Sequence, residues 1–196
     1  MAPVVGAAGP AIALLELASI AVGHRTLDAL LKQAEVQLLV ARPVSPGRWI
    51  ILITGQVEEL SSALRRGVEV AGAALVDRLF IPNVEPSLLA LVSAPGAVPE
   101  SLDAVGTLET LSVASVIAAG DAAAKAASIS LLSLGLARGL GGKCWVSFTG
   151  ELSDVSAAMD AGAAAASTAG MLLERVVIPR PDPRLGEILA RGVDLS

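Results

Sequence analysis

The chain alternates between short apolar runs and segments whose apolar residues recur every three or four positions. Apolar runs of this length predict buried strands, whereas the three-and-four spacing predicts helices with one buried face. Residues 24–34 show the helical pattern, with Asp28 and Lys32 forming an i,i+4 pair on the polar side. The first half is therefore expected to contain strands at residues 11–19, 36–40, 49–54 and 75–81, and helices at 24–34, 56–74 and 86–92.

The second half repeats this pattern in the same order. The pair Asp28 and Lys32 returns as Asp121 and Lys125 with the same spacing. Such a long series of ordered matches indicates an internal duplication. Further matches join Leu15 and Glu16 to Leu108 and Glu109, Ser19 to Ser112, Thr54 and Gly55 to Thr149 and Gly150, Gly67 to Gly162, Arg78 to Arg175, and Ile81 and Pro82 to Ile178 and Pro179.

The duplication predicts two tandem βαββαβ domains of the mixed α/β (α+β) class. Each is expected to be a ferredoxin-like sandwich, a sheet with two helices on one face. The first domain is expected at residues 11–92 and the second at residues 105–193. Between them, residues 93–104 contain Pro and Gly without any periodicity, which is typical of a linker.

Two loops occupy equivalent places, each between the second and third strand of its half. The first carries two prolines, whereas the second is longer and rich in glycine. The second could cradle phosphate, but it lacks the Lys-Ser/Thr pair of a P-loop and precedes a strand, so a simple sharp loop is favoured. The candidate loop residues are Pro43, Val44, Ser45, Pro46 and Gly47, and Leu136, Ala137, Arg138, Gly139, Leu140, Gly141 and Gly142.

The composition favours a protein that buries surface against partners. Hydrophobic residues make up 54% of the chain and aromatic residues only 2%, so the core must consist of Ala, Val, Leu and Ile. An apolar excess of this kind favours oligomerisation. No window of about 20 residues is free of charge or helix breakers, which argues against a membrane span. The first basic residue is Arg25, which argues against a secretory signal.

Charge and candidate chemistry exclude further classes of function. The net charge is −5 and the 14 basic residues are scattered along the chain, which argues against a nucleic-acid partner. The one cysteine, Cys144, excludes an intrachain disulfide and is consistent with a cytoplasmic protein. We interpret Cys144 as a small buried thiol and the one histidine, His24, as a solvated residue at a helix start. No catalytic or metal-binding set is therefore expected.

Several motifs resemble those of bacterial microcompartment shell proteins. Residues 28–34 and 121–127 are similar to the D-x-x-x-K-A-A helix of that family, and the resemblance covers about residues 11–193. Because both halves begin with the first strand, the chain resembles the unpermuted, single-layer tandem-domain class. Residues 139–144 are similar to the propanediol-utilisation type of that class. Further similar segments are residues 149–155, 160–165 and 177–181.

The resemblance implies a structural role without catalysis. It implies a homotrimer that forms a flat pseudo-hexameric tile and packs against other hexameric, trimeric and pentameric shell proteins in a cytoplasmic shell. The two loops would converge on the tile axis and form a pore for small polar metabolites. Lys32 and Lys125 would lie on the tile edges. Arg180 matches the family's edge arginine, and Asn83 stands in its place in the first half.

Ser45 is the main departure from the propanediol type. In those relatives a cysteine in the equivalent loop supplies an iron–sulfur cluster, whereas a serine hydroxyl is too weak a ligand to hold one. Cys144 matches a cysteine that lies past the loop, so no cluster or other cofactor is expected. We expect a polar pore rimmed by Ser45 hydroxyls, and we expect Arg42, Arg48 and Arg138 to favour anions.

Two other functions are compatible with the sequence. A trimer of βαββαβ units could bind a small effector between subunits as a sensor, and discrete trimers that bind nucleotides would support that function. An enzyme with an intersubunit site could use Cys144 or His24, and a loss of turnover in Cys144→Ala would support it.

Overall fold

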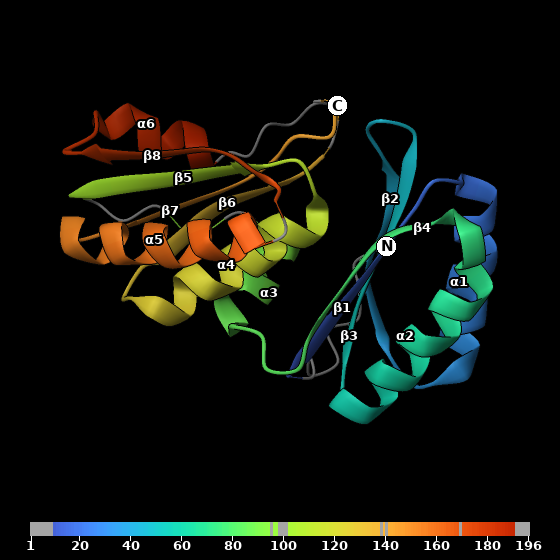
Figure 1. Ribbon diagram of the computed structural model, residues 1–196. Coiled ribbons are helices and arrows are strands. Elements are labelled where there is room, and N and C mark those ends of the chain that lie inside the picture. Colours follow the sequence, from blue (N-terminus) through green and yellow to red (C-terminus); the bar gives the residue numbers. More distant parts are fainter. Residues whose placement is uncertain are drawn as a thin grey trace. The chain divides into compact units, whose positions relative to one another are not determined.

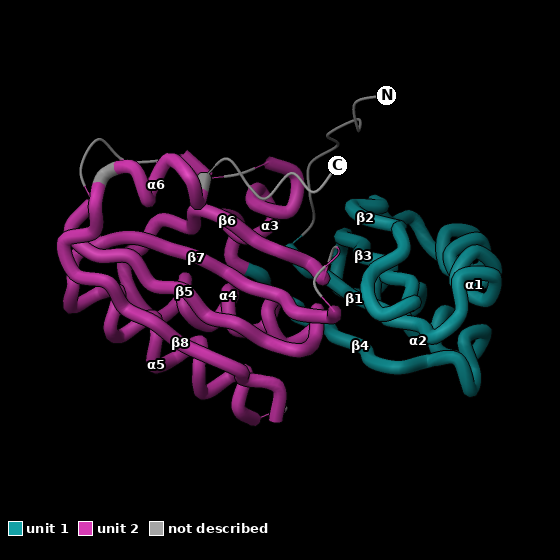
Figure 2. The backbone as a smooth tube through the Cα atoms, turned by 90° about the horizontal axis from the view of Figure 1, so that it is seen from above, with its two compact units in different colours: residues 1–84 teal, residues 85–196 magenta. Residues whose placement is uncertain are grey.

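The computed structural model describes residues 10–94, 96–97, 102–137, 139, 141–168 and 170–190. The chain divides into two compact units between Val84 and Glu85 (Figures 1 and 2). Each unit contains one four-stranded sheet with helices packed against it. The prediction of two tandem units of the mixed α/β class is confirmed.

The first unit is an antiparallel sheet covered by two helices. Its strands lie in the order β2-β3-β1-β4, and α1 and α2 pack along the same face (Figure 1). The unit consists of β1 (Ala11–Leu17), α1 (Ile20–Gln33), β2 (Gln37–Val44), β3 (Arg48–Gly55), α2 (Val57–Ala71), the short 3-10 helix η1 (Gly72–Ala74) and β4 (Leu75–Ile81).

The core of the first unit lies between this sheet and its helices. Leu15 and Leu17 on β1 are buried in it, as expected for alternate residues of a strand with one face toward helices. The helix α2 approaches the strand closely at Gly67, where a Cβ atom would lie 2.5 Å from Leu15 Cδ1. In the second unit a Cβ atom at Gly162 would lie 2.6 Å from Leu108 Cδ1. Close packing therefore explains why this glycine recurs in the duplication.

The second unit has the same sheet with additional helices. Its strands lie in the order β6-β7-β5-β8, with α4 and α5 along one face and α6 along the other (Figure 1). The helix α3 contacts β6 and α4. The unit consists of α3 (Pro86–Ser93), β5 (Ala104–Thr110), α4 (Val113–Ala126), β6 (Ser130–Leu136), β7 (Cys144–Gly150), α5 (Leu152–Thr168), β8 (Leu172–Pro179) and α6 (Pro183–Ala190).

The duplicated polar residues have the same local roles in both units. Ser19 and Ser112 are the N-caps of α1 and α4, and each hydroxyl accepts a bond of 3.3 Å from a backbone N–H in the first turn. Thr54 and Thr149 each donate from Oγ1 to the first carbonyl of β1 or β5 at 2.7 Å. These bonds fix the helix starts and the strand ends at equivalent places in the two units.

One expectation differs from the structure. The helix expected from residue 24 begins earlier, at Ile20, because Ser19 caps it there, so His24 lies within α1. The compact units divide between Val84 and Glu85, because α3 makes its contacts within the second unit. The linker expected at residues 93–104 stays a prediction. Residues 95 and 98–101 of that linker lie outside the described residues. Over the described part of the chain, none of the helices has the length and apolarity that a bilayer crossing requires.

Candidate functional site

The first candidate loop is a tight turn between β2 and β3. Val44 is buried and pairs with Arg48 across the turn, so the strand ladder continues to its base. Pro43, Pro46 and Gly47 are exposed and Ser45 is half-buried. Gly47 has a φ of +67°, a conformation that glycine adopts without steric cost. The turn therefore presents Ser45 and the two prolines at the end of the sheet.

The second candidate loop, between β6 and β7, has a different backbone. Its glycines Gly139, Gly141 and Gly142 all have positive φ, and so does Ala137, at +52°. Three of these four positions are glycine because left-handed backbone crowds a Cβ atom. Arg138 and Leu140 lie outside the described residues. The glycine content predicts a sharp loop, but it does not predict the left-handed conformation of Ala137.

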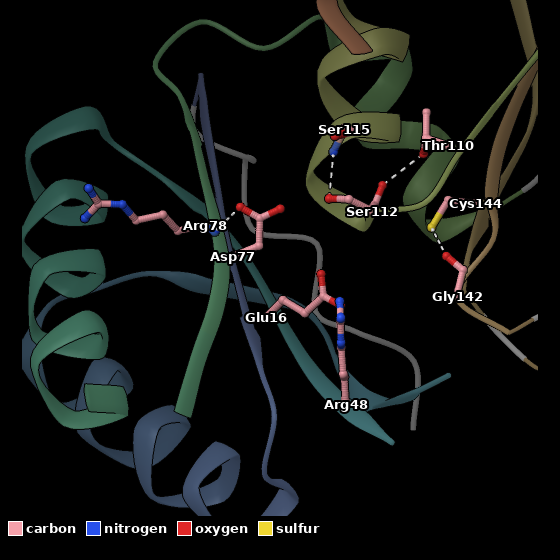
Figure 3. A network of polar contacts seen from close by, with 9 residues as sticks. All are labelled: Glu16, Arg48, Asp77, Arg78, Thr110, Ser112, Ser115, Gly142 and Cys144. Atoms are coloured by element: carbon pink, nitrogen blue, oxygen red, sulfur yellow. Dashed lines mark hydrogen bonds and ion pairs between the residues drawn. The ribbon is translucent and has the colours of Figure 1, made fainter. Parts of the chain in front are cut away.

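An ion pair lies where each loop joins its strands. Glu16 Oε1 on β1 accepts a bond of 2.8 Å from Arg48 Nη1, at the first residue of β3 (Figure 3). In the second unit Lys143 Nζ lies 3.3 Å from Glu109 Oε2. The sequence shows that Glu16 recurs as Glu109, but only the register of the strands brings each glutamate next to its basic partner, Arg48 or Lys143. Neither ion pair is among the contacts that the sequence predicts.

Cys144 and His24 are held in ways that do not suggest catalysis. The Cys144 side chain is fully buried, and its thiol donates a hydrogen bond of 3.6 Å to the Gly142 carbonyl oxygen (Figure 3). His24 is exposed and meets the Trp49 ring edge to face, with centroids 4.6 Å apart. Within the described residues, no three His, Cys, Asp or Glu side chains are grouped to hold a metal ion.

The two candidate edge lysines are in unequal environments. Lys32 lies 2.7 Å from Asp28, and both side chains are largely exposed. Lys125 lies 2.6 Å from Asp121, whose side chain is only 10% exposed. The other carboxylate oxygen of Asp121 accepts a bond of 2.8 Å from the backbone N–H of Glu85. Lys125 is therefore paired with a carboxylate that the fold holds in place, whereas Lys32 is paired with a solvated one.

The other two candidate edge residues follow the last strand of each half. Asn83 and Arg180 are both exposed. Arg180 has a φ of +46°, and its backbone N–H donates to the carbonyl oxygen of Asp103 at 2.6 Å. Nearby, bonds from the side chain and then the backbone of Arg184 lower the pKa of the Asp182 carboxyl. The turn after β8 is thus held by one bond to the residue before β5 and by the local bonds between Arg184 and Asp182, with the Arg180 side chain exposed.

Comparison with known proteins places these features in one family. A family model described as the BMC domain matches residues 11–84 and 104–181. The bacterial microcompartment shell protein PduT of Citrobacter freundii is 40% identical over 182 residues, covering 93% of this chain and 98% of the relative. The shell protein EutM of Escherichia coli K12 is 39% identical over 92 residues, covering 47% of this chain and 93% of the relative.

Solved structures show the same fold. A crystal structure of a microcompartments protein from Desulfitobacterium hafniense has a TM-score of 0.83 and 41% identity, covering 90% of this chain and 98% of that one. A fused permuted hexameric shell protein from the RMM microcompartment has a TM-score of 0.56 at 18% identity, over 80% and 81% of the two chains, and it supports the fold alone. The resemblance inferred from the motifs is confirmed.

Proposed function

Because this chain belongs to the BMC-domain family, as a structural microcompartment shell protein with two tandem domains, we propose that three copies form a pseudo-hexameric tile with a central pore. The observation that carries this proposal is the duplication itself. One chain contains two BMC matches, whereas EutM corresponds to about half of it. Three chains therefore supply six domains to one ring, and a closed ring satisfies the same interface at each step.

An exposed apolar strand supports association of the chains. β8 lies at the edge of the second sheet, and its Val176 and Ile178 are 46% and 38% exposed. They pair with Thr107 and Val105, so they lie on the sheet face opposite the one that meets α5 at Gly106 and Leu108. Exposed apolar edges favour pairing with another chain. In the proposed tile, a neighbouring copy covers this surface.

The pore in this proposal is formed by three copies of each loop. Residues 43–47 provide a stiff rim with Ser45, and residues 136–142 provide a longer glycine-rich rim, so the opening has three-fold symmetry. Its lining of hydroxyl groups and backbone amides suits small polar metabolites. Because position 45 is a serine and not a cysteine, the rim formed by residues 43–47 lacks the thiolate ligands that hold an iron–sulfur cluster.

The tile edges in this proposal contact other shell proteins. Lys32 and Lys125, together with Asn83 and Arg180, lie along them, and the partners are hexameric, trimeric and pentameric shell proteins of a cytoplasmic microcompartment. The exposure of Lys32, Asn83 and Arg180 in the single chain is consistent with surface that becomes buried on tiling.

Sedimentation equilibrium of the purified chain tests the proposed assembly. We expect the mass of three chains across a tenfold range of concentration. A monomer at all concentrations would contradict the tile. Discrete trimers that bind nucleotides and never associate further would favour a small-molecule sensor instead.

A further inference from the structure

The two ion pairs, Glu16 with Arg48 and Glu109 with Lys143, occupy the same register position in both units. Glu16 lies opposite Ile50 in the pairing of β1 with β3, and Arg48 is two residues before Ile50. Glu109 lies opposite Trp145 in the pairing of β5 with β7, and Lys143 is two residues before Trp145. Arg48 and Lys143 therefore each reach their glutamate diagonally across one face of the sheet. The contact has the same geometry in the two units, but its basic residue is an arginine in the first and a lysine in the second.

The two pairs differ sharply in burial. The side chain of Glu16 is 3% exposed and that of Arg48 is 34% exposed, whereas Glu109 and Lys143 are 39% and 55% exposed. The second oxygen of Glu16, Oε2, is buried and finds no hydrogen-bond donor among the described residues. Arg48 thus faces a carboxylate that has little contact with water and no other described partner.

The burial of each pair determines how completely the glutamate compensates the positive charge of Arg48 or Lys143. A buried carboxylate has lost its hydration, so it binds a guanidinium through a strong charge-assisted hydrogen bond. An exposed pair such as Glu109 and Lys143 is weakened by water and screened by salt, and its partners separate readily. Arg48 is therefore held as half of a neutral pair, whereas Lys143 is available to a passing anion.

We propose that Glu16 determines the charge selectivity of the pore by neutralising Arg48, and that Lys143 supplies positive charge at the loop bases. This inference rests on the proposed pore and names small anions as the class of solute that responds. It revises the expectation that Arg48 favours anions, because its charge is compensated within the sheet. Glu16 is a specificity-determining residue in this account, although it does not touch the solute.

The test measures ion selectivity of the full-length assembled protein in planar lipid bilayers under a KCl gradient. The reversal potential gives the ratio of chloride to potassium permeability. E16Q preserves side-chain size and removes the carboxylate charge that is paired with Arg48, while Asp77, opposite Glu16 on β4, is unchanged, so we expect the reversal potential to shift toward the chloride equilibrium potential. The matched variant E109Q, at the same register position, should shift it less, because Lys143 is already solvated.

Two further variants keep the test decisive even if E16Q does not fold. The double variant E16Q/R48Q removes both charges and should return the wild-type ratio, and K143Q should lower the ratio. Arg42, on β2, is unchanged in every variant and contributes equally to each. Equal shifts of the reversal potential for E16Q and E16Q/R48Q would overturn this inference and leave the proposed pore standing. An unchanged chloride-to-potassium permeability ratio for E16Q or K143Q would do the same. Absence of wild-type conductance would instead contradict the pore itself, and this inference with it.

Discussion

At the scale of single residues, two glycines determine how closely a helix approaches each sheet. Gly67 on α2 and Gly162 on α5 lie where a Cβ atom would overlap the end of a leucine on the central strand. A glycine within a helix costs about 1 kcal/mol relative to alanine. The close packing of helix and sheet explains why glycine is present at both positions despite that cost.

Gly67→Ala tests this packing. The added methyl group would lie 2.5 Å from Leu15 Cδ1, so the leucine or the helix must move. Overpacking of this kind typically costs 1–3 kcal/mol, and we expect a net loss of about 1 kcal/mol after the gain in helix propensity. Urea denaturation measures the change in the free energy of unfolding.

The control for Gly67→Ala is Arg65→Ala, on the exposed side of the same helix. It should change the unfolding free energy by no more than about 0.5 kcal/mol. A Gly67→Ala variant as stable as the wild type would show that the contact with Leu15 relaxes without cost.

The residue scale is also where the sequence was least informative. Glu16 and Arg48 are separated by 32 positions, and Asp121 and Glu85 by 36. No local pattern joins residues so far apart. The recurrence of Glu16 as Glu109 was visible, but its meaning depends on strand register, which the sequence does not specify. The candidate loop residues could be named because Pro and Gly mark turns locally.

At the scale of the elements, capping residues decide where the first helix of each unit begins. The apolar periodicity predicts a helix only from residue 24 and places Ser19 in the preceding strand, whereas Ser19 caps α1 and the helix begins at Ile20. The equivalent Ser112 caps α4. A serine after an apolar strand is thus better interpreted as a helix start than as a strand end.

Ser19→Ala and Ser112→Ala test these caps. Each substitution removes the acceptor for a backbone N–H in the first turn, and we expect a loss of about 1 kcal/mol in the free energy of unfolding. Urea denaturation measures both. Ser61→Ala, within α2, is the matched control and should be neutral or slightly stabilising, because alanine has the higher helix propensity. Equal effects at all three positions would argue against a capping role.

At the scale of the whole molecule, the exposed face of β8 is expected to hold the assembly together. Val176→Lys places a charge on this face, where burial by a neighbouring chain would be costly. We expect a larger monomer fraction in sedimentation equilibrium and an unchanged circular dichroism spectrum. Ser167→Lys makes the same charge change at the exposed end of α5 and should remain trimeric. A trimeric Val176→Lys variant would place the interface elsewhere.

The duplicated architecture could be predicted from the sequence because many separate motifs recur in the same order. Apolar runs and helical periodicity located nearly every element, and the motifs around Asp28 and Asp121 indicated the family. The division of the units at Val84 and Glu85 could not be predicted, because the contacts of α3 with β6 and α4 involve distant segments. The domain boundaries at residues 92 and 105, like the pore and edge assignments, stay predictions.

In the proposed assembly, three duplicated chains make one ring with two unequal sets of loops around a single opening. Electron microscopy of the purified full-length chain tests it most directly. We expect pseudo-hexagonal particles with six domain densities, a central opening of three-fold and not six-fold symmetry, and edge-to-edge arrays at high concentration. Isolated monomers, or rings in which residues 43–47 and 136–142 lie away from the axis, would contradict it.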